Sequence, residues 1–185
     1  QWVVSGYTLM LGALILIGGS LGDRYGRRRI FLAGLIGFVV GAALSGVAPT
    51  PELLIVARLL QGVGGALLIP NSLALISVAY PKGERGRAIG TWAATTAITA
   101  GLGPLIGGAL VDAVSWRAVF FVNAPIGVVA LWLVVRHVPS DPNRTQERRP
   151  DWLGAVLALI GLASLMYGLI ESSRAQLSSP VPVWG

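Results

Sequence analysis

The sequence predicts an all-α protein, a polytopic transmembrane helical bundle. Of its 185 residues, 54% are hydrophobic and only 12% are charged, whereas soluble domains carry about 25% charged residues. The mean hydropathy is +0.73. Long apolar windows recur along the chain, and most of the charged residues gather in the segments between them. These observations indicate that most of the chain lies in lipid.

Six apolar windows are long enough to cross the hydrocarbon core of a bilayer. In order they are residues 2–21, 30–48, 52–79, 88–111, 116–138 and 152–170. Pro70 lies inside the third window and predicts a kink or tilt there. We expect no strands, because every β-branched run lies inside a window long enough to span the membrane.

The basic residues predict which loops face the cytoplasm. The net charge is +6, yet eleven of the fourteen Lys and Arg residues lie in alternate loops, at 24–29, 82–87 and 136–149. This asymmetry is typical of the positive-inside rule. We therefore expect the loops at Tyr25, Gly83 and Asn143 to be cytoplasmic and those at Thr50 and Ser115 to face outward. The same distribution argues against a nucleic-acid-binding surface.

Three structural units are predicted along the chain. Residues 1–138 form most of an N-terminal helical bundle. Residues 139–150 form a polar, proline-bounded cytoplasmic linker, for which a simple connection and a regulatory role both remain open. Residues 151–185 form a further transmembrane helix and the start of the next loop or span. Because the chain begins at Gln1 and ends at Pro182-Val-Trp-Gly185, we expect it to be an internal fragment.

Composition also argues against several kinds of chemistry. The chain has no cysteine and one histidine, so we expect no metal site and no cofactor. A primary pump is disfavoured because Lys82 is the only lysine and no G-x-x-x-x-G-K-[ST] motif occurs. A membrane enzyme would need paired carboxylates, a histidine cluster or a nucleophile motif. Asp23, Asp112 and Glu171 are too scattered to form such a set, so we expect no catalytic residues and no enzyme activity.

A charge-dense segment, Gly19-Ser-Leu-Gly-Asp-Arg-Tyr-Gly-Arg-Arg-Arg29, joins the first two windows. Its glycines permit a sharp turn and close helix approach. Asp23 can pair with an arginine or face the positive N-terminus of another helix. The pattern G-x-L-x-D-R-x-G-R-R resembles the loop between the second and third helices of the major facilitator superfamily, a large class of secondary transporters. The resemblance implies a conformational latch between two halves of a transporter, made here by Gly19, Asp23, Arg24, Gly26, Arg27 and Arg28. The alternative is that Arg27 to Arg29 only anchor the topology.

The third window carries an arginine inside an apolar run. Arg58 lies six residues past Glu52, which is about 9 Å along a helix. A charged side chain in that position costs about 2.5–3.5 kcal/mol on insertion scales and usually serves function. The pattern R-x-x-Q-G-x-G-x-A resembles the fourth-helix motif of the same superfamily, which implies a role in proton coupling for Arg58, Gln61 and Gly62. The alternative is that Arg58 snorkels to the outer interface.

The fourth window ends in Gly101-Leu-Gly-Pro-Leu-Ile-Gly-Gly108. Gly103 and Gly107 form a small-xxx-small face, and Pro104 removes a backbone hydrogen bond, so we expect a bendable, closely packed helix. The core G-P-x-x-G-G resembles the fifth-helix motif of antiporters in the superfamily, which selects Gly103, Pro104, Gly107 and Gly108. The earlier family glycine at position 90 is present, whereas Thr99 departs from the pattern. Structural packing alone is the alternative.

The fifth window opens with Trp116-Arg-Ala-Val-Phe-Phe-Val-Asn-Ala-Pro-Ile-Gly127. The form W-R-x-x-F-x-x-N-x-P-x-G resembles the start of the sixth helix in the fourteen-helix drug/proton antiporter group. It selects Trp116, Arg117, Asn123 and Pro125, and Asn123-x-Pro125 predicts a locally irregular backbone. For Trp116 and Arg117 we favour the simpler interpretation, an anchor at the membrane interface.

The resemblance covers nearly the whole chain and implies helices two to seven of fourteen, without the first helix or the C-terminal half of the same chain. It implies proton-coupled efflux of small molecules or drugs by alternating access, with protons, substrate and the lipid bilayer as partners, in a bacterial plasma membrane. A uniporter or symporter of the same superfamily and a transporter-like membrane sensor without transport remain open.

Overall fold

The computed structural model describes residues 2–139 and, in the C-terminal part, residues 153–154, 156–157, 160–165 and 167–168. Its helices are α1 (Trp2–Tyr25), α2 (Arg27–Val47), α3 (Pro51–Ala79), α4 (Arg85–Ala113), α5 (Ala118–Phe121) and α6 (Asn123–His137). Within the described residues, 5 stretches are long and apolar enough to cross a membrane, the last of them containing α5 and α6 together. The predicted all-α fold is confirmed. The sixth predicted span lies partly, and residues 140–150 of the linker entirely, outside the described residues.

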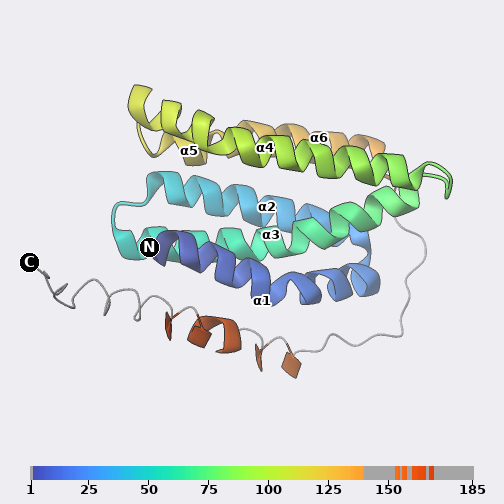
Figure 1. Ribbon diagram of the computed structural model, residues 1–185, viewed down its shortest axis with the longest axis horizontal. Helices are drawn as coiled ribbons and strands as arrows, with labels where there is room; N and C mark the ends of the chain where they lie inside the picture. Colours follow the sequence, from blue (N-terminus) through green and yellow to red (C-terminus); the bar gives the residue numbers. More distant parts are fainter. Residues whose placement is uncertain (1, 140–152, 155, 158–159, 166, 169–185) are drawn as a thin grey trace, which may run out of the picture.

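The helix α3 is central to the described part of the molecule, because it packs along both α1 and α2. The helix α6 packs on α2, whereas α4 contacts only its chain neighbours α3 and α5 among the described helices. The α1–α2 turn and the α3–α4 loop lie at one end of the helices, and the α2–α3 and α4–α5 connections lie at the other (Figure 1). The two described loops that we expect to be cytoplasmic therefore share one end.

Small and polar side chains form the core. The buried apolar residues are mostly alanines, such as Ala42 and Ala66, and the largest fully buried side chains are Gln61, Asn71 and Ser45. Large apolar side chains point outward instead, with Leu16 81% exposed. This distribution is typical of helices in lipid, where association depends on close packing and interhelical hydrogen bonds rather than on burial of large apolar groups.

Close backbone approach joins α2 to α3. A Cβ atom on Gly34 would lie 2.7 Å from the Cβ of Leu67 and 2.9 Å from the carbonyl oxygen of Gly64. Both atoms belong to, or sit directly on, the α3 backbone, so neither can move without moving the helix. Glycine at position 34 is therefore required for the observed distance between the two helices.

The turn between α1 and α2 is tighter than the sequence predicts. The first two predicted spans leave residues 22–29 between them, but α1 continues to Tyr25 and α2 begins at Arg27. Gly26 alone turns the chain, with φ of +99°, which favours glycine. Asp23 and Arg24, at the end of α1, and Arg27 and Arg28, at the start of α2, are consequently helical residues. The helix continues because backbone groups at membrane depth need internal partners, which outweighs the modest helix propensity of glycine.

The fifth predicted span is interrupted near its start. The helix α5 ends at Phe121 and α6 begins at Asn123. The side-chain amide of Asn123 donates to the carbonyl oxygens of Val119 at 3.2 Å and Phe120 at 3.3 Å, across this interruption. Val122, between the two helices, keeps a helical φ of −61° and ψ of −24°, and its N–H still bonds to the carbonyl oxygen of Ala118. The irregularity predicted from Asn123-x-Pro125 is therefore limited to the hydrogen bonding, and the Asn123 side chain bonds across it.

Candidate functional site

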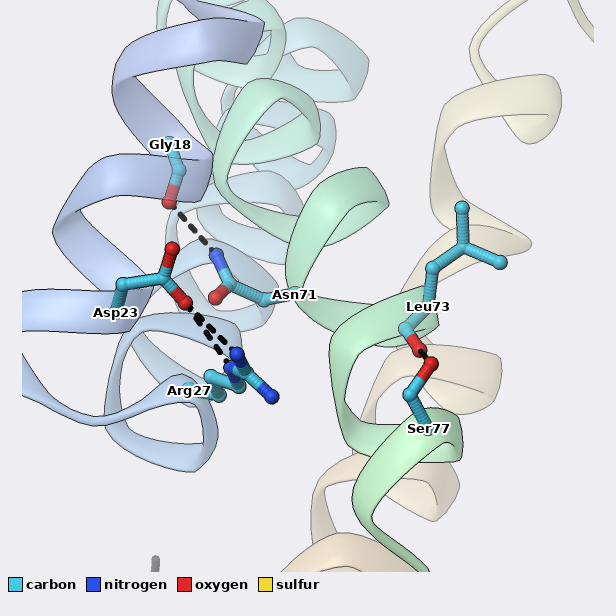
Figure 2. A network of polar contacts seen from close by, with 6 residues as sticks. All are labelled: Gly18, Asp23, Arg27, Asn71, Leu73 and Ser77. Atoms are coloured by element: carbon cyan, nitrogen blue, oxygen red, sulfur yellow. Dashed lines mark hydrogen bonds and ion pairs between the residues drawn. The ribbon is translucent and has the colours of Figure 1, made fainter. Parts of the chain in front are cut away.

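The latch residues lie at the end of α1 and the start of α2. Oδ1 of Asp23 accepts hydrogen bonds from Nε of Arg27 at 3.1 Å and from its Nη2 at 3.0 Å. Figure 2 shows this pair beside the end of α3 that carries Asn71. Of the two neighbours that the sequence allows for Asp23, an arginine and the N-terminus of another helix, an arginine is present. Both side chains remain partly exposed, with Asp23 52% exposed, so the pair is accessible from the end of the bundle.

The other latch arginines have different neighbours. Nη2 of Arg28 donates to the carbonyl oxygen of Val135 at 2.8 Å, in the last turn of α6. A cation is favourable there because the final carbonyls of a helix carry partial negative charge. The guanidinium of Arg24 lies 5.3 Å from the ring centroid of Tyr25. Arg28 thus connects the latch to α6, a contact that topology anchoring alone does not require.

Arg58 is half-buried and surrounded by groups from three helices. Its guanidinium lies 4.3 Å from the ring centroid of Tyr7 in α1 and 5.9 Å from that of Phe120 in α5. Its Nη1 donates to Oε1 of Gln61 at 2.6 Å, and Gln61 is only 2% exposed. Cation–π contacts at these distances are attractive. The guanidinium is therefore held inside the bundle, which disfavours the snorkelling alternative.

The glycine beside Gln61 permits this arrangement. A Cβ atom on Gly62 would lie 2.6 Å from the carbonyl oxygen of Tyr7 and 2.9 Å from the Cβ of Met10. Gly62 therefore lets α1 approach α3 closely enough for the Tyr7 ring to cover Arg58. The structure brings together Arg58, Gln61 and Gly62, the three residues of the predicted proton-coupling motif, and adds Tyr7 to them.

Arg117 and Trp116 occupy the opposite end of the bundle. Nη2 of Arg117 donates to the carbonyl oxygen of Ala48, the C-cap of α2, at 3.1 Å, and its guanidinium lies 4.4 Å from the Trp116 ring. The Trp116 and Phe120 rings meet edge to face at 6.1 Å. Arg28 and Arg117 thus bind the C-terminal carbonyls of α6 and α2, respectively. Arg117 ties two helices together, which is more than the interfacial anchor that we favoured from the sequence.

The predicted antiporter motif stands apart from these groups. Gly103, Pro104 and Gly108 are exposed and Gly107 is half-exposed. A Cβ atom on any of the three glycines would meet nothing within 4 Å among the described residues. The described part of the chain therefore gives α4 no packing partner along this face, and the close packing expected for it stays a prediction. Pro125 is likewise exposed, near the start of α6.

Sequence analysis missed three residues of the site, Tyr7, Asn71 and Phe120. A polar side chain inside an apolar run is a known signal, and it applies to Asn71. Phe120 is the fixed aromatic residue of the W-R-x-x-F-x-x-N-x-P-x-G pattern, but the pattern does not indicate that it lies near Arg58. Tyr7 carries no such signal, because an aromatic residue in a membrane-spanning window is usually a lipid or core contact. Among the described residues, no group of His, Asp or Glu side chains could hold a metal ion.

Comparison with known proteins gives a consistent set of matches. A family model described as Major Facilitator Superfamily matches residues 1–184. The chain is 39% identical to a methylenomycin A resistance protein of Bacillus subtilis, over 97% of this chain and 38% of that protein. It is 42% identical to a puromycin resistance protein of Streptomyces alboniger, over 93% of this chain and 34% of that protein. It is 38% identical to a tetracenomycin C resistance and export protein of Streptomyces glaucescens, over 100% of this chain and 33% of that protein.

A solved structure shares the fold. The chain superposes on the inward-open xylose transporter XylE from E. coli with a TM-score of 0.59 and 16% sequence identity, over 91% of this chain and 46% of that chain. At that identity the likeness concerns the fold alone. The chain spans about a third of the length of the three curated relatives named above.

Proposed function

The chain belongs to the Major Facilitator Superfamily, and from this premise we propose that it forms part of a secondary active transporter that exports small molecules in exchange for protons. The names of three relatives support export, since two are resistance proteins and one is a resistance and export protein. The transporter would be a multi-pass protein of a bacterial plasma membrane. Residues 139–150 would form its cytoplasmic linker, and 151–185 would begin its next helices.

The observation that carries proton coupling is Arg58, held between the Tyr7 ring and Gln61 inside the bundle. A guanidinium stays protonated at all relevant pH values, so Arg58 is not itself the proton carrier. It acts instead by favouring the ionised form of a nearby carboxylate. The described acidic residues, Asp23, Glu52, Glu84 and Asp112, all lie at helix ends. The carboxylate would therefore come from another part of the protein, and the helix preceding α1 is the candidate we favour.

Arg58 and the latch residues together suggest a transport cycle. The carboxylate takes a proton from the outer side, which removes the charge that Arg58 attracts, and it releases the proton to the cytoplasm. The two halves of the transporter rock about a central site between these steps. The latch residues, at the end of the bundle that we expect to be cytoplasmic, hold the halves together in one of the two states. The Asp23–Arg27 pair is exposed enough to exchange partners during that motion.

Transport by the full-length protein in inverted membrane vesicles tests the proposal. Puromycin, methylenomycin A and tetracenomycin C are the first substrates to try. Accumulation should follow an interior-acid pH gradient and collapse with a protonophore. Arg58→Ala should abolish accumulation while substrate binding persists, and Arg58→Lys should retain part of the accumulation. Arg136→Ala, at an exposed arginine, is the control and should behave as the wild type. Substrate flux that does not depend on the pH gradient would indicate a uniporter. Accumulation under the opposite gradient would indicate a symporter, and substrate binding without flux would indicate a sensor.

A further inference from the structure

Asn71 forms a polar connection between α1 and α3 close to the latch. It is 1% exposed and follows Pro70 in α3. Its Nδ2 donates two hydrogen bonds, to the carbonyl oxygen of Gly18 in α1 at 2.9 Å and to that of Leu67 in its own helix at 2.8 Å. Figure 2 shows the amide lying between Gly18 and the Asp23–Arg27 pair. Both N–H groups of the side chain are thus used, one in each helix.

The other half of the amide is fitted against Gly22. A Cβ atom on Gly22 would collide with Oδ1 of Asn71 and would lie 2.7 Å from its Cγ. Gly22 therefore leaves the space that the Asn71 side chain fills, one residue before Asp23. Any side chain at position 22 would displace either the amide or the end of α1.

Pro70 contributes a second contact between the same helices. Proline has no N–H, so the carbonyl of Ala66, four residues earlier, receives no helical hydrogen bond from it. A Cβ atom on Gly18 would collide with that carbonyl oxygen and would lie 3.2 Å from the Cα of Leu67. The Cα–H of Gly18 therefore faces an oxygen that Pro70 leaves without its usual donor, a geometry in which a weak Cα–H···O contact forms.

These contacts continue a line of close approach between α1 and α3. The line begins where Gly62 meets Tyr7 and the Tyr7 ring covers Arg58. It ends at Gly22 and Asn71. Residue 71 lies 13 positions after residue 58 in α3, a distance of about 20 Å along a helix. The two predicted functional sites are thus connected by one helix–helix seam, and Asn71 forms its last polar contact before the latch.

We propose that Asn71 is the positioning residue for the latch: its side-chain amide, bonded to Gly18 and fitted against Gly22, fixes the end of α1 on α3 and thereby sets the place of Asp23. This inference rests on the latch role assigned to Asp23 in the proposed function. Asn71 acts through the backbone of α1, and the seam makes α1 and α3 move as one body when the two halves rock. A displacement at Arg58 would then reach Asp23 without a change in the α1–α3 contact.

Spin-label distances in the full-length protein measure the positioning directly. Labels at cysteines replacing Tyr25 and Tyr80 report the ends of α1 and α3, and both sites are exposed. Asn71→Leu keeps the number and branching of the side-chain heavy atoms but cannot bond to Gly18, so the 25–80 distance should lengthen or broaden. A second label pair at Val47 and Leu53, at the opposite end, should not change. An unchanged 25–80 distance in Asn71→Leu, and in Asn71→Ala if the leucine variant fails to fold, would overturn the proposal.

A double-mutant cycle, read out by transport, distinguishes a positioning role of Asn71 from simple packing. Asp23→Asn and Asn71→Leu should each lower efflux at saturating substrate, and the double variant should be no slower than Asp23→Asn alone, since both changes act on one latch. Multiplied losses in the double variant would show that Asn71 acts independently of Asp23 and would refute the positioning role. If Asp23→Asn transports at the wild-type rate, the latch assignment fails, and the spin-label distances still decide whether Asn71 positions α1.

A size-compensating pair tests the contact with Gly22. Gly22→Ala should reduce efflux severalfold, because the added methyl meets the Asn71 amide. Asn71→Ala removes the obstructing atoms, so the double variant Gly22→Ala, Asn71→Ala should transport better than Gly22→Ala alone. Gly12→Ala is the matched control on α1, since its Cβ would meet only Leu162 at an ordinary 3.7 Å. Failure of the second change to improve transport would show that Gly22 does not accommodate Asn71.

Discussion

The contact between Tyr7 and Arg58 gives the sharpest test of how the arginine is held. Tyr7→Leu removes the ring that lies 4.3 Å from the guanidinium and leaves the hydrogen bond to Gln61 intact. Tyr7→Phe keeps the ring and removes only the hydroxyl. If the ring face attracts the cation, the two variants will differ, although both lose the same polar atom.

The size of the effect follows from distance and burial. A cation–π contact contributes about 0.5–1 kcal/mol when exposed and about 2 kcal/mol when desolvated. Tyr7 and Arg58 are each half-buried, so we expect about 1–1.5 kcal/mol between them. The Phe120 ring, at 5.9 Å, lies near the limit of the interaction and contributes less. Since about 1.4 kcal/mol is a tenfold change in equilibrium, loss of the ring should raise the fraction of displaced guanidinium about tenfold.

Reversible unfolding of the full-length protein in mixed micelles measures this coupling. Tyr7→Leu, Arg58→Met and the double variant form a cycle, whose interaction term isolates the pair from the change in packing volume. We expect a favourable interaction of about 1–1.5 kcal/mol. Tyr7→Phe, measured in the same way against Arg58→Met, should retain most of it.

The reasoning would be refuted by an interaction term below about 0.3 kcal/mol, which is within the additivity expected of independent sites. Equal loss of coupling in Tyr7→Leu and Tyr7→Phe would also refute it, because the hydroxyl rather than the ring would then hold the arginine. In proton-driven efflux, Tyr7→Leu should be impaired and Tyr7→Phe nearly normal if the position of Arg58 determines coupling.

Three further predictions concern the helix packing around these sites and the topology of the chain. Arg117→Gln should lower the free energy of unfolding by about 1 kcal/mol, because the carbonyl of Ala48 loses a charged donor. Arg117→Lys should lower this free energy less, and equal stability in all three proteins would mean that the contact is unimportant. Gly34→Ala should destabilise the protein by about 1–3 kcal/mol through overpacking against α3, whereas Gly37→Ala, whose Cβ would lie 3.9 Å from its nearest neighbour, should change the unfolding midpoint little. Single cysteines at positions 25 and 83 of a full-length protein without other cysteines should react with an impermeant reagent only from the cytoplasmic side. Those at positions 50 and 115 should react only from outside. Reaction of position 25 in intact cells would show that the predicted orientation is wrong.

The first five predicted spans agree with the described helices because hydrocarbon imposes one strong rule, that backbone groups at membrane depth must bond internally. The same rule explains the main error in the local structure. Gly22 lies just past the first predicted span, where its low helix propensity favours a loop, yet α1 continues through it to Tyr25. The lack of a side chain at Gly22 serves packing instead, since the space where its Cβ would lie is occupied by the Asn71 side chain from α3.

Hydropathy and charge along the chain were enough to predict the fold class, the number and order of the described spans, and the charged residues inside and between them. Hydropathy and charge act on each segment separately, so their effects can be computed along the chain. Three sets of contacts, in contrast, are visible only in the folded bundle. Tyr7 covers Arg58, Arg28 and Arg117 bind the ends of α6 and α2, and Asn71 reaches Gly18. Each of these contacts joins residues about 50 or more positions apart, and each depends on which faces of two helices meet. The helix faces that meet are determined by the fit of small residues such as Gly18, Gly34 and Gly62 against particular atoms of a neighbouring helix. This fit depends on two segments at once, so the sequence of one segment does not reveal it.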